Sequence, residues 1–161
     1  MSLFGFPNPV NEKAARVVAG VVLVGAIVIL ATGWLWLLVP LAYGFWARVL
    51  TGPRLSPLGW LAQRKVAPRL GAPKHVPGPP KRFAQAIGTA FTTAAAILGL
   101  VAGATTAAYV LTALLAVAAG LESIFAVCLG CHAFALLMRA GIVPERVCAE
   151  CADIWSRRAA A

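Results

Sequence analysis

Two long apolar stretches dominate the hydrophobic pattern of the chain. No Asp, Glu, Lys or Arg occurs in residues 17–47 or 83–121. A membrane-spanning helix needs about 20 apolar residues, so each stretch is longer than one span. Turn-forming residues interrupt each stretch once, at 32–33 and at 103–106. The pattern therefore predicts an all-α integral membrane protein with four transmembrane helices in two hairpins, at 14–31, 34–50, 83–102 and 107–127.

The first hairpin is short for two full spans. Arg16 and Arg48 at its two ends would therefore extend toward the lipid headgroups. Trp34 and Trp36 are placed for one membrane interface and Trp46 for the other, as in the aromatic belts of membrane proteins. A single long, tilted helix through this stretch is the alternative.

Composition excludes a water-soluble globular protein. Of the 161 residues, 61% are hydrophobic and 12% are charged, and the mean hydropathy is +0.85, whereas soluble domains are about 25% charged. The length predicts a single membrane domain over 1–161. The net charge is +9, but the basic residues crowd into a few polar segments instead of spreading over a folded surface. We therefore expect the lipid bilayer and no nucleic acid as a partner.

The basic residues all fall on one face of the predicted bundle. The loop at 51–82 is rich in proline, contains no acid and includes a segment at 56–66 that could form a short interfacial helix. The hairpin turns contain no charge. Because positive loops stay inside, we expect this loop and both termini to be cytoplasmic. Besides Arg48 at the end of the first apolar stretch, the basic residues are Lys13, Arg16, Arg54, Arg64, Lys65, Arg69, Lys74, Lys81, Arg82, Arg139, Arg146, Arg157 and Arg158.

All four cysteines occur in the C-terminal region at 128–161, as two C-x-x-C pairs. The first pair is Cys128 and Cys131, and the second is Cys148 and Cys151. Residues three apart on a helix are neighbours, which predicts that Cys128 and Cys131 lie close together. The second pair follows Pro144, and residues 144–158 predict an amphipathic helix on the cytoplasmic side of the membrane.

Three interpretations of the cysteines remain open. In the first, each pair is a dithiol that cycles through a disulfide and relays electrons or sulfur, with all four cysteines catalytic and no cofactor. In the second, the C-x2-C-x16-C-x2-C spacing binds zinc through the four thiolates, with His132 as a further ligand. In the third, the cysteines only pack. The apolar setting of the first pair favours redox chemistry, and Arg139 and Arg146 could lower thiol pKa values.

Glu122 is the only carboxylate within an apolar span. Acids inside a membrane are costly, so Glu122 is a further candidate for a catalytic role. Its alternative is a structural pairing with His132 or Arg48. We expect its side chain to face the bundle. Six residues separate it from Cys128, which would place the two on different faces of one helix. A small transporter is a third class, supported only by Glu122 and the small residues of the last two spans.

Several segments resemble the bacterial integral membrane family called domain of unknown function 4395. They are Asn8-Pro9-Val10-Asn11, 82–88, Gly120-Leu121-Glu122, the first cysteine pair, Leu137-Met138-Arg139, Pro144-Glu145 and the second pair. The resemblance implies a small protein of the bacterial inner membrane, encoded near thioredoxin-like proteins and sulfurtransferases. It assigns no catalytic residue.

These observations together predict a thiol–disulfide or sulfur relay with a thioredoxin- or rhodanese-like partner, and hence a candidate oxidoreductase. The alternative is a non-enzymatic membrane protein with a structural zinc site. The sequence leaves the substrate and self-association open.

Overall fold

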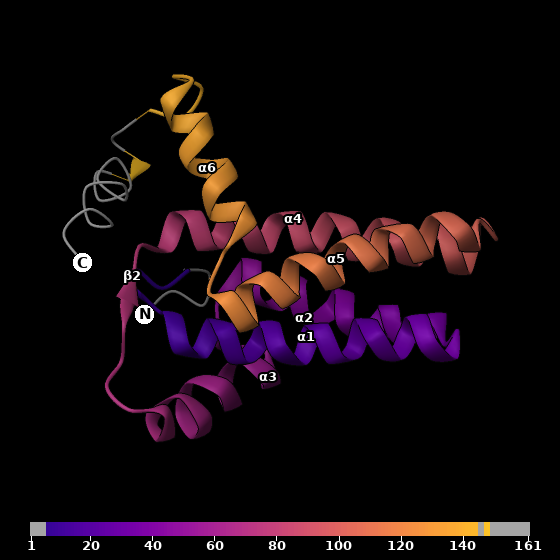
Figure 1. The fold of residues 1–161 in the computed structure, drawn as a ribbon, viewed down its shortest axis with the longest axis horizontal. Coiled ribbons are helices and arrows are strands. Elements are labelled where there is room, and N and C mark those ends of the chain that lie inside the picture. Colours follow the sequence, from indigo (N-terminus) through magenta and orange to yellow (C-terminus); the bar gives the residue numbers. More distant parts are fainter. Residues whose placement is uncertain (1–5, 145–146, 149–161) are drawn as a thin grey trace.

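The computed structural model describes residues 6–144 and 147–148, and most of them are helical (Figure 1). A two-residue antiparallel pairing between β1 and β2 is the one sheet within this part of the chain. The elements are β1 (Val10–Asn11), α1 (Glu12–Thr32), the 3-10 turn η1 (Leu35–Leu37), α2 (Leu38–Thr51), α3 (Pro57–Leu61), the π-helical turn η2 (Ala62–Val66), the 3-10 turn η3 (Ala67–Leu70), β2 (His75–Val76), α4 (Gly78–Ala96), the π-helical turn η4 (Ile97–Val101), α5 (Thr105–Phe125) and α6 (Leu129–Arg139).

Four helices form an elongated bundle (Figure 1). α1 packs mainly on α5, α2 mainly on α4, and α4 also on α5, whereas α1 and α2 touch each other little. Three helices in the described chain are long and apolar enough to cross a membrane, namely Glu12–Thr32, Gly78–Val101 and Thr105–Phe125; Leu35–Thr51 is apolar but shorter. The all-α prediction is therefore confirmed. The single-helix alternative for the first stretch is wrong, because α1 ends at Thr32 and Gly33 has a left-handed φ of 75°.

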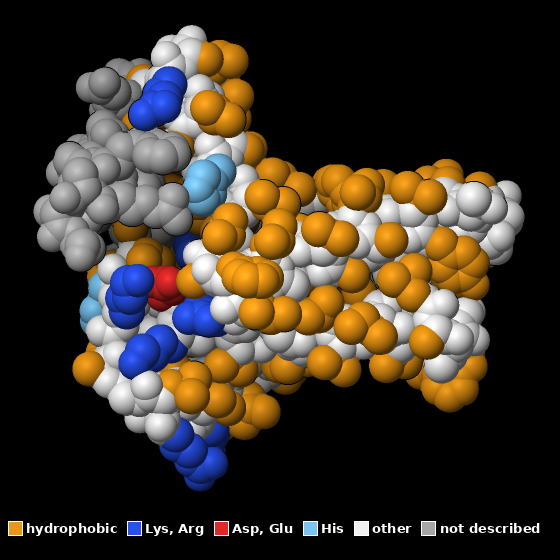
Figure 2. Space-filling model, viewed as in Figure 1, with side chains coloured by type: hydrophobic (Ala, Val, Ile, Leu, Met, Phe, Trp, Pro, Cys, Tyr) orange, Lys and Arg blue, Asp and Glu red, His pale blue; other side chains and the backbone are white. Residues whose placement is uncertain are grey.

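Charged side chains gather at one end of the bundle, beside α3 and the start of α6 (Figure 2). Exposed apolar side chains cover the bundle surface elsewhere, including Val24, Ile27 and Val117. At the uncharged end, the rings of Trp34 and Trp36 stack with their centroids 6.4 Å apart. An apolar belt between a charged end and an aromatic end is the surface that a lipid bilayer requires.

Arg48 does not extend outward, so that expectation is wrong for Arg48. The Arg16 guanidinium donates hydrogen bonds to the carbonyl oxygens of Ser123, at 3.0 and 3.2 Å, and of Ile124, at 3.2 Å. These carbonyls end α5 and lack helical partners, so Arg16 caps that helix. Arg48 is buried and donates from Nε to Oε1 of Gln85 at 2.8 Å. Arg48 therefore finds its acceptor inside the protein, whereas Arg16 finds its acceptors at the end of α5.

The basic loop folds back along α1 (Figure 1). Its predicted helix is present: the Ser56 hydroxyl caps α3 by accepting from the Gly59 N–H at 3.1 Å, and Trp60 is half-exposed. Farther along, β2 pairs with β1, and Lys74 forms an ion pair with Glu12 at 2.9 Å. α4 then starts at Gly78, five residues earlier than predicted, because two prolines can occupy the first turn of a helix.

α6 leaves the bundle at a steep angle (Figure 1). It packs on α4, where the rings of Phe83 and Phe134 lie 5.7 Å apart. Gly130 permits this contact, because a Cβ at that position would lie 2.5 Å from the Cβ of Ala84. The predicted amphipathic helix at 144–158 lies almost wholly outside the described residues.

Candidate functional site

The first cysteine pair lies at the amino-terminal end of α6. α5 stops at Phe125, and Ala126 turns the chain with a left-handed φ of 59°. Cys128 is then the N-cap of α6, and its Sγ accepts a hydrogen bond from the Cys131 N–H at 3.4 Å. The two Sγ atoms lie 2.7 Å apart, and both cysteines are free thiols. The predicted closeness of Cys128 and Cys131 is therefore confirmed.

This position favours ionisation of one thiol over the other. A hydrogen bond from the Cys131 thiol lowers the pKa of Cys128, and the positive charge of Lys81 and the Cys131 N–H act in the same direction, against burial and Glu122. The same hydrogen bond, together with burial, raises the pKa of Cys131. A thiolate at a helix N-terminus is also stabilised by the helix dipole. The arrangement therefore favours the thiolate at Cys128 and the proton at Cys131.

A buried ion pair stands beside the dithiol. The Lys81 Nζ lies 2.6 Å from Oε1 of Glu122, and the two side chains are only 10% and 15% exposed. Glu122 faces the bundle as predicted, and it forms its ion pair with Lys81, where His132 or Arg48 was expected. The sequence pattern predicted that Lys81 belongs to the basic loop. Because α4 starts earlier than predicted, Lys81 lies inside the protein instead. Lys81 also supplies the positive charge expected from Arg139 and Arg146; Arg139 ends α6 and Arg146 lies outside the described residues.

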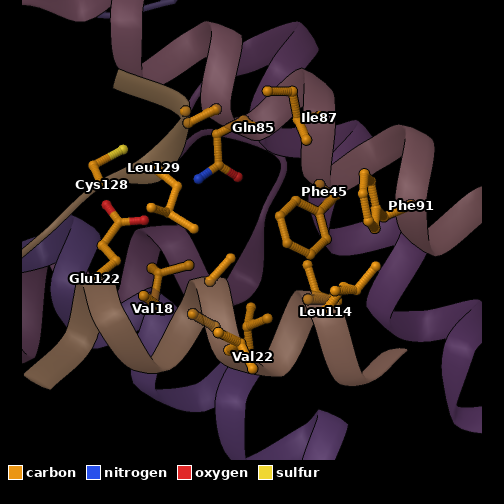
Figure 3. A pocket seen from close by; sticks show the side chains of 18 of the residues that line it. Val18, Val22, Phe45, Gln85, Ile87, Phe91, Leu114, Glu122, Cys128 and Leu129 are labelled. Carbon is orange, nitrogen blue, oxygen red and sulfur yellow. The ribbon is translucent and has the colours of Figure 1, made fainter. Parts of the chain in front are cut away.

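Two cavities meet at Cys128. One, of about 420 Å³, lies at the charged end and is lined by Cys128, Cys131, Lys74, Lys81, His75 and His132, among others. The other, of about 360 Å³, lies among the bundle helices (Figure 3). Glu122 lines this inner cavity together with Cys128. The expectation that Glu122 and Cys128 lie on different faces of one helix is therefore wrong, because α5 ends between them.

The second cysteine pair is only half described. Cys148 is buried against Phe134 and Met138 and is disulfide-bonded, whereas Cys151 lies outside the described residues. Nδ1 of His132 lies 2.9 Å from the carbonyl oxygen of Cys128. Within residues 6–144 and 147–148, no group of three or more His, Cys, Asp or Glu is placed to hold a metal ion. The four-cysteine zinc site includes Cys151 and stays a prediction.

Two further polar residues belong to this region: Arg48, which the sequence suggested only as a pairing partner of Glu122, and Gln85, which it did not suggest. Both line the inner cavity, as Cys128 does. Gln85 is the only amide or charged side chain within residues 83–121, so its rarity was a signal. The burial of Arg48 had no comparable signal, because an arginine that follows an apolar stretch usually reaches the headgroups.

The fold and the site together define a class: an all-helical protein with helices of membrane-spanning length and a dithiol at a helix N-terminus. The chain belongs to the family described as domain of unknown function (DUF4395), whose sequence model matches residues 10–139. The match includes the first cysteine pair, Glu122 and Lys81. No curated protein and no solved structure matches the chain.

Proposed function

We propose that this protein is a bacterial inner-membrane thiol–disulfide oxidoreductase whose reacting groups are Cys128 and Cys131. Four helices would cross the membrane in two hairpins, with the charged end in the cytoplasm. Its partner would be a soluble thioredoxin-like protein or a sulfurtransferase. The second pair, Cys148 and Cys151, would exchange electrons with the first.

One observation supports this proposal most strongly: two free thiols, 2.7 Å apart, one of them the N-cap of a helix. A packing role does not require sulfurs in contact or an arrangement that lowers the pKa of one thiol and raises that of the other. Exchange requires both, because one sulfur must attack as the thiolate and the second must resolve the intermediate.

The exchange would proceed through a mixed disulfide. The Cys128 thiolate attacks one sulfur of the partner disulfide, and the other partner sulfur leaves as a thiolate. Cys131 then gives up its proton and attacks Sγ of Cys128, which releases the second partner thiol. Cys128 and Cys131 end as a disulfide and the partner as a dithiol, and the reverse sequence oxidises the partner. With a persulfide partner, Cys128 would accept the outer sulfur.

Trapping the mixed disulfide tests the function. The reagent is a thioredoxin whose single remaining cysteine is activated as a disulfide with thionitrobenzoate. Wild-type protein should release thionitrobenzoate and then free the thioredoxin, whereas Cys131→Ser should retain thioredoxin on Cys128, as seen on a non-reducing gel. Cys128→Ser is the matched control and should retain none. Equal adducts on the two variants, or none on either, would contradict the proposal.

Labelling from the two sides of the membrane tests the topology. Single cysteines would replace Thr32 and Thr105 at the uncharged end and Ala72 in the basic loop, in a chain whose native cysteines are serines. An impermeant maleimide added to intact cells should label the first two sites and spare the third, because basic segments stay inside. Labelling of Ala72→Cys alone would show the opposite orientation in the membrane. Labelling of all three sites would show that the chain does not form two transmembrane hairpins.

A further inference from the structure

The inner cavity has an apolar body and a polar end. Side chains such as Val22, Phe91 and Leu114 line the body, and Gln85, Glu122 and Cys128 lie toward the other end (Figure 3). Its volume of about 360 Å³ falls within the roughly 300–1,000 Å³ typical of small-molecule sites. Dithiol exchange with a soluble protein does not use this space.

Arg48 lines this cavity, and one of its hydrogen-bond donors has no acceptor among the described residues. Arg48 is 6% exposed, and its Nε donates a hydrogen bond to Gln85. The carbon at the centre of its guanidinium lies 4.5 Å from the centre of the Phe45 ring. Its Nη2 atom is buried with no hydrogen-bond partner among the described residues. A buried donor without an acceptor is costly, and an oxygen acceptor on a ligand would complete the arrangement.

The ligand must therefore be a largely apolar molecule with an acceptor oxygen, held against a thiol. We propose that the inner cavity binds a membrane quinone, which accepts two electrons from Cys128 and Cys131. A quinone has carbonyl oxygens for Arg48, a ring and tail that fit an apolar space, and an electrophilic ring for the thiolate. This proposal rests on the proposed dithiol function and adds the oxidant that regenerates the disulfide.

The reaction balances as two thiols plus one quinone giving one disulfide plus one quinol. The Cys128 thiolate adds to a ring carbon, which forms a C–S bond and moves an electron pair onto the quinone oxygen. Arg48 stabilises that oxyanion through Nη2. Cys131 then loses its proton and attacks Sγ of Cys128, so that the S–S bond forms and the C–S bond breaks with its electron pair left on the ring. The two thiol protons account for the two hydroxyls of the quinol.

The test uses reduced full-length protein in detergent without oxygen, with decylubiquinone as the probe. We expect up to two quinols per chain, one for each dithiol, detected by absorbance, and a Cys128–Cys131 disulfide, detected by mass spectrometry. Ala118→Phe should react at least about tenfold more slowly, because the added ring fills the cavity. Val110→Phe is the matched control, since Val110 is on the same helix, is exposed and does not line the cavity. It should react like the wild type.

A second variant probes the donor itself. Arg48→Gln should raise the quinone concentration at half-maximal rate about tenfold, because one hydrogen bond to the ligand is lost, while Arg64→Gln in the basic loop should not. Rates with diamide, a small soluble oxidant, should be unchanged in Ala118→Phe and Arg48→Gln, which shows that the dithiol is intact.

The outcomes separate the two proposals. Oxidation by diamide without oxidation by decylubiquinone would overturn the quinone site and leave the dithiol function standing. Equal quinone rates in Ala118→Phe and the wild type would place the reaction outside the cavity and also overturn it. If no quinol forms and oleate displaces bound decylubiquinone, the cavity would be assigned to a fatty acid instead. If Cys131→Ser traps no thioredoxin and diamide also fails to oxidise the dithiol, the underlying function would be defeated.

Discussion

The two ends of the helix bundle are built by different rules. At the uncharged end, Ile29, Leu38, Ala95 and Ala108 form a fully buried apolar cluster, and no charged residue lies in either turn. The charged end contains two cavities. A buried ion pair, a buried arginine and two free thiols are among the groups that line them. At the uncharged end, close packing fixes the helices. The charged end retains cavities and buried charges, which close packing would remove.

Breaking the ion pair gives the largest predicted effect. Lys81→Met leaves the Glu122 carboxylate buried without its partner, which we expect to cost about 3–5 kcal/mol of unfolding free energy. The measurement is the SDS-induced unfolding midpoint in mixed micelles, followed by tryptophan fluorescence. Lys65→Met, on the exposed basic loop, is the control and should change stability by less than about 0.5 kcal/mol.

The double variant Lys81→Met, Glu122→Leu sharpens this test. It removes both charges, so we expect most of the lost stability to return. If Lys81→Met alone unfolds like the wild type, the pair contributes nothing to the fold and the contrast between the two ends loses its main support.

A methyl group added between α2 and α4 gives the next effect. The Cβ of Gly88→Ala would lie 2.2 Å from Cε1 of Phe45, so the ring or the helix must move, at about 1–3 kcal/mol. Gly25→Ala is the matched control within α1, because its Cβ would lie 3.7 Å from Leu41, an ordinary contact. Thermal unfolding in detergent should show Gly88→Ala lower and Gly25→Ala equal or higher than the wild type. The reverse order would contradict the packing described.

The uncharged end was predictable from the sequence, and the charged end only in part. Uninterrupted apolar stretches and single breaks were enough to place α1, α2, α4 and α5, because helix length in a membrane is set by the bilayer. The first cysteine pair was found from its spacing, because an i, i+3 relation is local.

The partners within the site were not predictable, because they depend on contacts between distant segments. Lys81 and Glu122 are 41 residues apart, and Arg48 and Gln85 are 37 apart. The positive-inside rule counts a basic residue near a span but does not say whether it turns inward. Ala126 was missed for another reason: a left-handed alanine has no sequence signature, so the end of α5 before Cys128 was hidden.

The third prediction compares the two charges beside Cys128. Lys81 lowers the pKa of this thiol and Glu122 raises it. Lys81→Gln should therefore raise the pKa of Cys128 and slow its alkylation at neutral pH, and Glu122→Gln should lower the pKa and speed it. We expect shifts of about one unit, equivalent to about 1.4 kcal/mol. The measurement is the rate of iodoacetamide modification of Cys128 against pH, read by peptide mass spectrometry.

The opposite signs make this prediction specific. A variant that only loosens the fold would speed alkylation at every pH, whereas a change of charge moves the midpoint along the pH axis. Lys65→Gln is the control and should leave the midpoint unchanged. Midpoints that move in the same direction for Lys81→Gln and Glu122→Gln would show that neither charge acts on the thiolate directly.

The smallest predicted effect again contrasts the two ends, through one backbone position at each. Gly33 and Ala126 both end a helix with a left-handed φ, of 75° and 59° respectively. A Cβ makes this conformation unfavourable by about 1 kcal/mol, so Gly33→Ala should lower and Ala126→Gly should raise the unfolding free energy by that amount. Thermal unfolding of the two variants measures both. If the strain at Ala126 positions Cys128, Ala126→Gly should also slow thioredoxin trapping while the protein becomes more stable. A gain in stability with unchanged trapping would show that the Ala126 turn ends α5 but has no part in placing the thiol.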